Sequence, residues 1–333
     1  MTQPHVLFIL DKWGMGREED GVSEWETNIW KSLEALGLTQ ISTFHFDEYY
    51  QLHKELGDAA LLAKCTDEKP DFICLVLYKV PGSYHTVPTY ETLHTINHIM
   101  KIPIVAIWGD LQSSVLRYVA DTLTPYTNVN MFTALSTGVN NIAHPETFFY
   151  SWVPKDPRIF CDLGLNRDIP ISYIGSPKLP RVAAIKFLID HGIDIYYTGG
   201  ERDTHISTEE YGQLLNRSQI SLSFSRSGDP ADNPPIHVIN ARTFEIMLCG
   251  AMLLEQYGIE TAKLYEPFID YVPYSTHEDM LEKVKYYLAH DNERMKVAKA
   301  GCQKTMTRYS SLRFWRMVCD KVDDVLVQIK KEV

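Results

Sequence analysis

An arginine and a glutamate stand three residues apart in the stretch Arg242-Thr-Phe-Glu245. On a helix these positions are neighbours on one turn. Such a helix start offers a guanidinium and unpaired N–H groups to a diphosphate, and a carboxylate can accept two hydrogen bonds from a ribose diol. The same two residues could also form an ordinary surface ion pair, which contributes little to the stability of a fold. Gly250 and the apolar run after it predict that the helix ends there and that a buried strand follows.

A second candidate phosphate site follows an expected strand over residues 169–174. The chain continues as Gly175-Ser176-Pro-Lys178-Leu-Pro-Arg181 and then as an apolar helix. A strand, a Gly-Ser turn and basic residues ahead of a helix direct N–H groups and cations toward phosphate, and a glycine lets a ligand approach the backbone. Similar turns connect many β–α units that bind nothing. The residue types at these four positions alone leave both interpretations open.

The elements that position these residues follow an alternating pattern. Apolar runs of buried-strand length alternate with helical signals near 89–100 and 113–122, which predicts a parallel, doubly wound sheet. A proline-bearing boundary at 150–168 precedes a second series of the same kind. We therefore predict domains at 1–165 and 166–310 and an amphipathic terminal helix at 311–333. The expected strands lie at 5–10, 71–77, 102–108, 129–133, 169–174, 193–197 and 220–224.

Composition excludes several classes of protein. The chain has 333 residues, 45% of them apolar and 23% charged, which is typical of globular domains. A net charge of −11 disfavours a broad nucleic-acid-binding surface. No apolar run approaches the length of a transmembrane helix, and the first residues do not resemble a signal peptide. Six cysteines without a Cys-x-x-Cys pair favour reduced thiols and a cytoplasmic location.

The order of motifs after Glu245 resembles a known family. Tyr265-Glu-Pro-Phe268 is followed by Leu288-Ala-His-Asp-Asn-Glu-Arg294 and by Ala298-Lys-Ala-Gly301. This order resembles the carboxy-terminal domain of GT-B glycosyltransferases, and is closest to the spore-maturation-protein-like branch of the group 1 superfamily. The resemblance covers roughly residues 169–315. It implies an α/β GT-B fold, in which two Rossmann-like doubly wound domains face each other across a cleft and the last helix crosses back to the first domain.

The resemblance also implies roles for individual residues. Glu245 would hold the ribose, and Arg242 and Arg181 would hold the diphosphate. His237 stands where many group 1 enzymes carry the first glutamate of a Glu-x7-Glu pair. The resemblance therefore does not specify which residues contact the donor sugar. The remaining candidates for the donor site are Gly199 and Gly200 in a turn beside the base, Arg226 and Asn240 at the rim, and the loop residues Gly14 and Gly16.

Transfer of a sugar leaves a negatively charged nucleoside diphosphate. We find no convincing Asp-x-Asp pair after a strand, so Lys178, Arg181, Arg242 and helix N-termini are expected to neutralise that charge without a bound metal. Asp110 follows an expected strand and would activate the acceptor hydroxyl, or alternatively cap the next helix. His94 and His98 have zinc-ligand spacing but lack the accompanying glutamate, so we interpret them as helix-surface residues.

Two further local motifs concern the amino-terminal segment. Gly14-x-Gly16 resembles part of a dinucleotide fingerprint, but the third glycine is out of register, so an acceptor-side loop fits better. Ser23-x-x-Glu26 is a capping-box signature at the start of an apolar helix.

The sequence leaves several functions open. The first is metal-independent transfer from a nucleotide sugar, a UDP-sugar or else a GDP-sugar, to a saccharide, glycan or other hydroxyl acceptor. The alternatives are a DNA-base (hydroxymethyl-pyrimidine) glycosyltransferase, which the negative charge disfavours, a non-catalytic nucleotide-sugar-binding protein, and a nucleotide-sugar epimerase. The base, sugar, acceptor and stereochemical outcome depend on loop conformations that the sequence does not specify.

Overall fold

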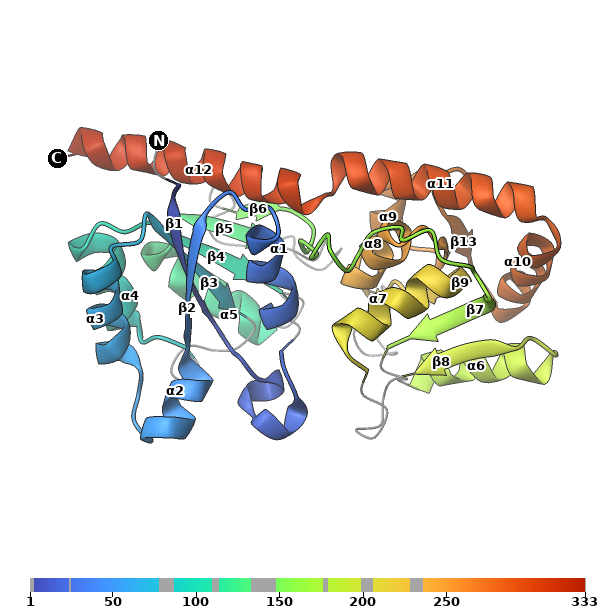
Figure 1. Cartoon of the computed structure of the whole chain (residues 1–333), viewed down its shortest axis with the longest axis horizontal. Helices are drawn as coiled ribbons and strands as arrows, with labels where there is room; N and C mark the ends of the chain where they lie inside the picture. Colours follow the sequence, from blue (N-terminus) through green and yellow to red (C-terminus); the bar gives the residue numbers. More distant parts are fainter. Residues whose placement is uncertain are drawn as a thin grey trace. The chain divides into compact units, whose positions relative to one another are not determined.

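The chain folds into two compact α/β units. The computed structural model describes residues 3–23, 25–77, 87–109, 114–132, 148–175, 179–198, 206–227 and 236–332. The first unit contains the described residues up to Asp156 together with Ser311–Val333, and the second contains those between Pro157 and Ser310. Each unit is built on one parallel sheet with helices packed against it (Figure 1). The prediction of two doubly wound parallel sheets is confirmed.

The first sheet has six parallel strands in the order β2-β1-β3-β4-β5-β6. Its central strands are almost wholly apolar and buried, as parallel strands covered on both faces require. β2 was not predicted, because it is an edge strand whose residues are polar or only partly buried. The strands are β1 His5–Leu10, β2 Gln40–His45, β3 Phe72–Leu77, β4 Ile104–Trp108, β5 Val129–Phe132 and β6 Phe148–Tyr150.

The helices of the first unit include two short π-helical segments, η3 and η4. The helix predicted at 89–100 is present but changes from α to π geometry after His94. The capping box was wrong in its detail: Ser23 Oγ accepts from the Trp25 amide, and the Glu26 carboxylate binds His45 instead. The segments are η1 Gly14–Gly16, η2 Glu18–Asp20, η3 Glu26–Trp30, α1 Lys31–Glu34, α2 Phe46–His53, α3 Asp58–Glu68, α4 Tyr90–His94, η4 Thr95–Ile99, α5 Ser114–Leu123 and η5 Thr124–Tyr126.

The last helix of the chain, α12 (Ser311–Glu332), belongs to the first unit. The indole Nε1 of Trp315 donates to Ser32 Oγ at 2.8 Å, and the Trp315 ring meets Phe8 edge to face with centroids 5.7 Å apart. At the start of the helix, Ser311 Oγ accepts from the Lys155 amide at 2.9 Å. These contacts make α12 part of the first hydrophobic core.

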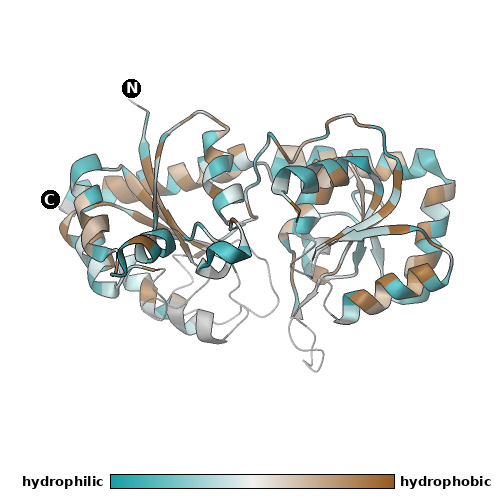
Figure 2. Cartoon of the chain, turned by 60° about the horizontal axis from the view of Figure 1, so that its bottom comes forward, coloured by the Kyte–Doolittle hydropathy of each residue, from teal (hydrophilic) through white to brown (hydrophobic). Residues whose placement is uncertain are grey.

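The second sheet has five parallel strands in the order β13-β12-β9-β7-β8, and a short antiparallel ribbon, β10–β11, follows β9. In the first unit the hydrophobic residues concentrate on the strands, whereas in the second unit strands and helices both carry hydrophobic and hydrophilic residues (Figure 2). The strands are β7 Ile169–Ile174, β8 Ile195–Thr198, β9 Ser218–Ser223, β10 Arg226–Ser227, β11 Ile236–His237, β12 Met252–Gln256 and β13 Val272–Tyr274.

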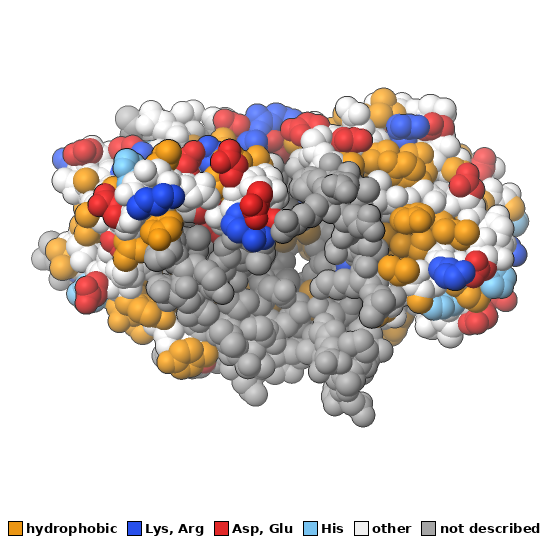
Figure 3. Space-filling view, turned by 90° about the horizontal axis from the view of Figure 1, so that it is seen from below, with side chains coloured by type: hydrophobic (Ala, Val, Ile, Leu, Met, Phe, Trp, Pro, Cys, Tyr) orange, Lys and Arg blue, Asp and Glu red, His pale blue; other side chains and the backbone are white. Residues whose placement is uncertain are grey.

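The described residues of the second unit include six helices. On α6, Ile185 and Leu188 are buried, but Val182 and Ile189 are exposed, and hydrophobic side chains show on this face of the unit (Figure 3). The apolar residues of α6 therefore extend beyond the stripe that its core contact uses. The helices are α6 Leu179–Asp190, α7 Thr208–Arg217, α8 Ala241–Leu248, α9 Ile259–Leu264, α10 His277–Ala289 and α11 Asp291–Arg308.

Candidate functional site

The carboxyl edge of the second sheet holds Arg242. From β7 the chain continues to β8 on one side of the sheet and then to β9 on the other, so a topological switch point lies at the end of β7, where open α/β sheets bind ligands. Arg242 is in the first turn of α8. Its Nε donates to the carbonyl of Ile174 at 2.7 Å, and its guanidinium carbon lies 5.1 Å from the ring centroid of Tyr173. The side chain is therefore fixed at the switch point.

Gly175 is the residue that makes this approach feasible. Its φ is +149°, and a Cβ at this position would overlap Nη2 of Arg242. The glycine that the sequence analysis assigned to a phosphate turn is thus required by the arginine beside it. Ser176 and Lys178, the next candidates in that turn, lie outside the described residues.

A second arginine reaches the same tyrosine from another helix. Arg181, in the first turn of α6, donates from Nη1 to the hydroxyl of Tyr173 at 3.3 Å. Tyr173 is itself fully buried. One aromatic side chain therefore brings two predicted diphosphate ligands to one edge of the sheet. The sequence analysis missed Tyr173, whose only signal is a hydroxyl-bearing aromatic residue near the end of an apolar strand.

Glu245 lies one turn along α8 from Arg242 and is only 6% exposed. Its Oε2 accepts a hydrogen bond from the hydroxyl of Tyr211, on α7, at 2.6 Å. Burial, together with the adjacent Glu245 charge, raises the pKa of Tyr211 well above its ordinary value, so the phenol keeps its proton. Tyr211 was not anticipated, because it is 34 residues away in sequence.

Hydrogen bonds connect the end of β9 to the start of α8. Asn240, the N-cap residue of α8, donates from Nδ2 to the carbonyl of Phe224 at 3.0 Å. Ser225 Oγ donates to the Tyr257 carbonyl at 3.3 Å and lies 3.2 Å from Nδ1 of His237. Because the single hydroxyl proton goes to Tyr257, Ser225 accepts from the imidazole Nδ1–H.

His237 also pairs with Arg226 in the β10–β11 ribbon. The ribbon therefore places the imidazole beside the last residues of β9. The Arg226 side chain lies outside the described part of the structure.

A buried glutamate on strand β12 contacts the first turn of α8. Glu255, in β12, is 0% exposed, and its Oε1 accepts from Thr243 Oγ1 at 2.6 Å. Burial raises the pKa of Glu255, although the hydroxyls of Thr243, Thr261 and Ser223 oppose the effect. Sequence analysis did not single out this residue.

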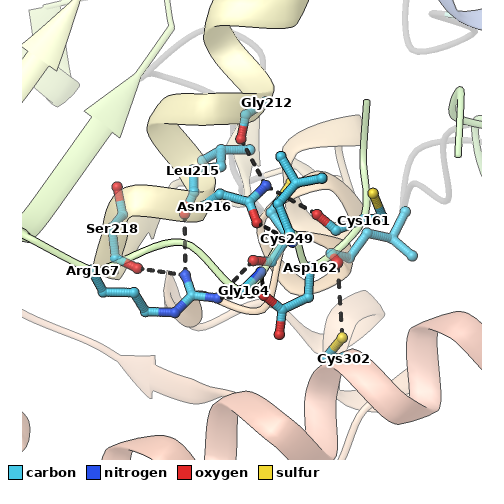
Figure 4. A network of polar contacts seen from close by, with 12 residues as sticks. Cys161, Asp162, Gly164, Arg167, Gly212, Leu215, Asn216, Ser218, Cys249 and Cys302 are labelled. Carbon is cyan, nitrogen blue, oxygen red and sulfur yellow. Dashed lines mark hydrogen bonds and ion pairs between the residues drawn. The ribbon is translucent and has the colours of Figure 1, made fainter. Parts of the chain in front are cut away.

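Arg167 fixes the other end of α8 (Figure 4). Its Nη2 donates to the carbonyl of Cys249 at 2.8 Å, and its Nη1 donates to the carbonyl of Ser218 at 2.9 Å. A cation at this position also complements the negative end of the helix dipole. Gly250 has φ +73°, and a Cβ there would lie 2.6 Å from Nη2 of Arg167. α8 is thus held at both ends, which fits a helix that must present Arg242 and Glu245 in a fixed orientation.

The two glycines predicted near the donor lie in the first unit, after β1. Gly14 N donates to the carbonyl of Gly21 at 2.7 Å, and a Cβ on Gly14 would lie 2.9 Å from the Asp20 carbonyl oxygen. Gly16 has φ +72°. Both glycines are therefore needed to close this loop, whose ends are joined by a bridge between Trp13 and Val22.

Three further predicted site residues, Asp110, Gly199 and Gly200, lie outside the described residues. The rings of His94 and His98 are 4.8 Å apart, and His98 Nε2 contacts the Pro125 carbonyl at 2.9 Å. Within the described ranges, no group of three His, Cys, Asp or Glu side chains could hold a metal ion. No helix in these ranges combines the length and the apolar character needed to cross a membrane.

Comparison with known proteins gives the class of the second unit. Residues 177–319 match a protein family described as "Glycosyl transferase-like". This segment contains Arg181, Arg242 and Glu245. The second unit is a glycosyltransferase domain. A search of curated sequences finds no match to the chain.

Solved structures give the fold of the whole chain. A glycosyltransferase from Rickettsia africae superposes with a TM-score of 0.63 at 10% identity, covering 98% of this chain and 99% of that one. HepE from Anabaena, in complex with UDP-glucose, superposes with a TM-score of 0.58 at 11% identity, covering 96% of this chain and 99% of that one. Sucrose-phosphate synthase from Thermosynechococcus elongatus superposes with a TM-score of 0.57 at 9% identity, covering 99% of this chain and 100% of that one. The glycosyltransferase domain and the unit before it together have the GT-B fold.

Proposed function

We propose that the chain transfers a glycosyl group from a UDP-sugar to an acceptor hydroxyl without a bound metal ion. The observation that carries the proposal is the convergence of Arg242 and Arg181 on Tyr173 at the switch point of the second sheet. The HepE structure that shares the fold contains UDP-glucose, which supports uridine as the base. The assignment to the spore-maturation-protein-like branch is part of the same proposal.

The chemistry follows from the charge that develops on the leaving group. When the bond from the anomeric carbon to the diphosphate breaks, the departing UDP gains negative charge. Two guanidinium groups and the N-terminus of α8 supply positive potential at one edge of the sheet, which is what such a transition state needs. Lys178 and the Gly175-Ser176 turn would add further donors to the same phosphates.

The nucleoside would be held beside that charge. We assign the ribose diol to Glu245, whose carboxylate is oriented by Tyr211, and the base to the turn at Gly199 and Gly200. Arg226, His237 and Asn240 would line the sugar side, and the loop at Gly14 and Gly16 would face the acceptor. Asp110 remains our sequence-based proposal for the acceptor base. Asp110→Asn should then spare donor binding and slow transfer.

Nucleotide calorimetry tests the donor site directly. Glu245→Ala should weaken UDP affinity by about 1–3 kcal/mol, as expected for losing a charged hydrogen-bond partner. Arg242→Ala should have an effect of the same order. Arg217→Ala is the matched control, because Arg217 is 44% exposed and pairs with Asp168 elsewhere on the same unit. If both site variants bound UDP as tightly as the wild type, the proposed donor site would be wrong.

A second experiment addresses the donor and the need for a metal. Thermal shifts with UDP, GDP, ADP and TDP should be largest for UDP, because a ligand that binds only the folded state raises the melting temperature. Transfer measured with and without EDTA should give the same rate. Loss of activity in EDTA that Mg²⁺ or Mn²⁺ restores would show that a metal is required.

A further inference from the structure

A buried carboxylic acid contacts the helix that carries Arg242. Glu255, near the carboxyl end of β12, has no exposed surface, and its Oε1 accepts a hydrogen bond from Thr243 Oγ1 at 2.6 Å. Thr243 follows Arg242 directly in the first turn of α8. The proposed donor site places the diphosphate at this turn. One hydrogen bond therefore connects the acid to the residues that would contact the phosphates.

Hydroxyl groups from three further segments lie near Glu255. Ser223 is its partner in the register of β9 and β12. The hydroxyls of Ser223 and of Thr261, on α9, both favour the charged carboxylate. Burial and then the Glu255 charge raise the pKa of Tyr271, just before β13, which locates this phenol near the acid as well. None of the three hydroxyl-bearing side chains has exposed surface, so the acid lies among hydroxyl groups inside the unit.

The same groups have unused hydrogen-bonding capacity. Within the described residues, four buried oxygen atoms near this carboxyl group have no hydrogen-bond partner: Glu255 Oε2, Ser223 Oγ, Thr261 Oγ1 and the Tyr271 hydroxyl. Buried polar atoms are normally paired, so this group of atoms needs an explanation. A hydroxyl can donate to a carboxylate or, after rotation, accept from a carboxylic acid. These hydroxyls can therefore serve as partners for Glu255 both with and without a proton.

The charged groups on the segments that follow β12 are paired with each other. Glu260 binds Lys263 at 2.9 Å within α9, and Asp270 binds Lys304 at 2.6 Å, which joins the segment before β13 to α11. The opposite charges of each pair largely cancel at a distance. Burial raises the pKa values of the neighbouring phenols and keeps them neutral; these are Tyr265, Tyr271 and Tyr274.

Arg242 connects this acid electrostatically to the nucleotide. Burial raises the pKa of Glu255, and the Arg242 charge acts against burial by favouring the ionised form. A diphosphate bound to Arg242 would neutralise that guanidinium and add negative charge at the same helix start. Both changes disfavour an ionised carboxylate at the same turn. A buried acid in that position avoids the cost by taking up a proton.

We infer that Glu255 takes up a proton when the diphosphate of the donor binds at the start of α8. The inference rests on the proposed donor site. The proton comes from solvent and bonds to Oε2, and the new O–H donates to a neighbouring hydroxyl while Oε1 keeps its hydrogen bond from Thr243. When the nucleotide leaves, the proton returns to solvent. Glu255 is thus a positioning residue, which acts on the donor site through Thr243 and through its charge.

Calorimetry with UDP-glucose measures this proton. UDP-glucose suits the test because its two phosphates are diesters and lack the second ionisation, near about pH 6, of a terminal phosphate. Titrations in buffers of different ionisation enthalpy, from about pH 5 to about pH 8, give the number of protons taken up on binding. The wild type should take up protons over part of this range. Its affinity should fall there by up to about tenfold per pH unit as pH rises.

Glu255→Gln removes the titrating group and keeps an oxygen that can accept from Thr243. Because glutamine resembles the protonated acid, the variant should lose the Glu255 share of the proton uptake. At about pH 8 it should bind UDP-glucose at least as tightly as the wild type, which a purely structural role would not produce. Other titrating groups near the donor site, such as His237 and Glu245, contribute to both proteins and cancel in the difference. Glu282→Gln, at an exposed position of α10, is the matched control and should behave as the wild type.

A second variant tests the same acid without replacing it. Thr243→Val removes a hydrogen bond that favours the charged carboxylate, so it raises the pKa of Glu255 with and without nucleotide. The pH range of proton uptake should therefore move upward. Uptake that stays in the wild-type range would contradict the role of Glu255.

The remaining outcomes are equally decisive. Equal proton uptake by the wild type and Glu255→Gln would assign the proton to another group. Wild-type affinity that does not change with pH would exclude the linkage. Weaker binding by Glu255→Gln at every pH would leave Glu255 a structural role only. Failure of the donor site is recognised separately, by UDP-glucose affinity that does not respond to Arg242→Ala, and a chain that binds no UDP-glucose contradicts both proposals.

Discussion

Thr243 Oγ1 lies 2.6 Å from Oε1 of Glu255 and joins the first turn of α8 to the strand beneath it. Glu255 has no exposed surface. Removing its carboxylate from water disfavours the charged form, so the pKa of this carboxyl is raised in the folded chain. The helix that carries Arg242 is thus supported by an acid whose ionisation the fold opposes.

This relationship predicts a pH dependence of stability. In the pH interval above the ordinary glutamate pKa, the unfolded chain has released the proton that folded Glu255 still holds. The folded state then binds more protons, so Glu255 makes the free energy of unfolding fall as pH rises toward its raised pKa. Glu255→Gln should remove this contribution. Urea unfolding from about pH 4 to about pH 8 measures it, with exposed Glu282→Gln as the control. An unchanged slope in Glu255→Gln would contradict the prediction.

Gly175→Ala should displace Arg242, because the added methyl group would occupy the position of its guanidinium. We expect UDP binding to weaken by about 1–3 kcal/mol, the scale of a lost charge-assisted hydrogen bond. Gly192→Ala is a suitable control, since Gly192 also has a positive φ (+80°) but has no atom within 4 Å of the added carbon. Calorimetry of both variants separates backbone strain from the clash. Equal affinities would mean that Arg242 does not contact the nucleotide.

Tyr211→Phe removes the hydroxyl that donates to Glu245. A buried carboxylate that loses a donor costs about 1–3 kcal/mol of unfolding free energy. The double variant Tyr211→Phe/Glu245→Gln should cost less than the sum of the single changes, because the two residues interact directly. Denaturant unfolding of all four proteins gives the coupling energy. Strict additivity would show that this hydrogen bond contributes nothing.

Trp315→Ala should destabilise the first unit by about 3–5 kcal/mol, the usual cost of removing a buried tryptophan side chain. Trp315 is 1% exposed and packs between Phe8 and the hydroxyl of Ser32. Val327→Ala, at an exposed position of the same helix, should be close to neutral. Thermal unfolding of the two variants compares them. A melting temperature for Trp315→Ala equal to that of Val327→Ala would show that α12 does not stabilise the unit.

The local sequence pattern was sufficient to predict the strands that are buried on both faces. The runs at 5–10 and 169–174 coincide with β1 and β7, because continuous apolar stretches of that length have few other structures open to them. β2 was not predicted, because an edge strand need not be apolar. Its last residue, His45, was therefore missed as well.

The partners of the candidate site residues could not be predicted. Arg242 was selected for its position on a helix, but its bond to Ile174 spans 68 residues, and the bond from Tyr211 to Glu245 spans 34. Glu26 shows the same limit. The Ser23-x-x-Glu26 motif predicted that Glu26 would cap its own helix, whereas in the folded chain its carboxylate contacts His45. Residue types indicated the chemistry, whereas only the tertiary fold determines which side chains orient them.

The placement of α12 affects how the protein is made. The first unit needs residues at both termini, so the polypeptide passes between units near Asp156 and again near Ser310. A ribosome has already released every residue of the glycosyltransferase domain before Trp315 emerges to cover Phe8. The first unit is consequently completed only after the second has been synthesised, and a chain that stopped before Trp315 would leave Phe8 without this contact.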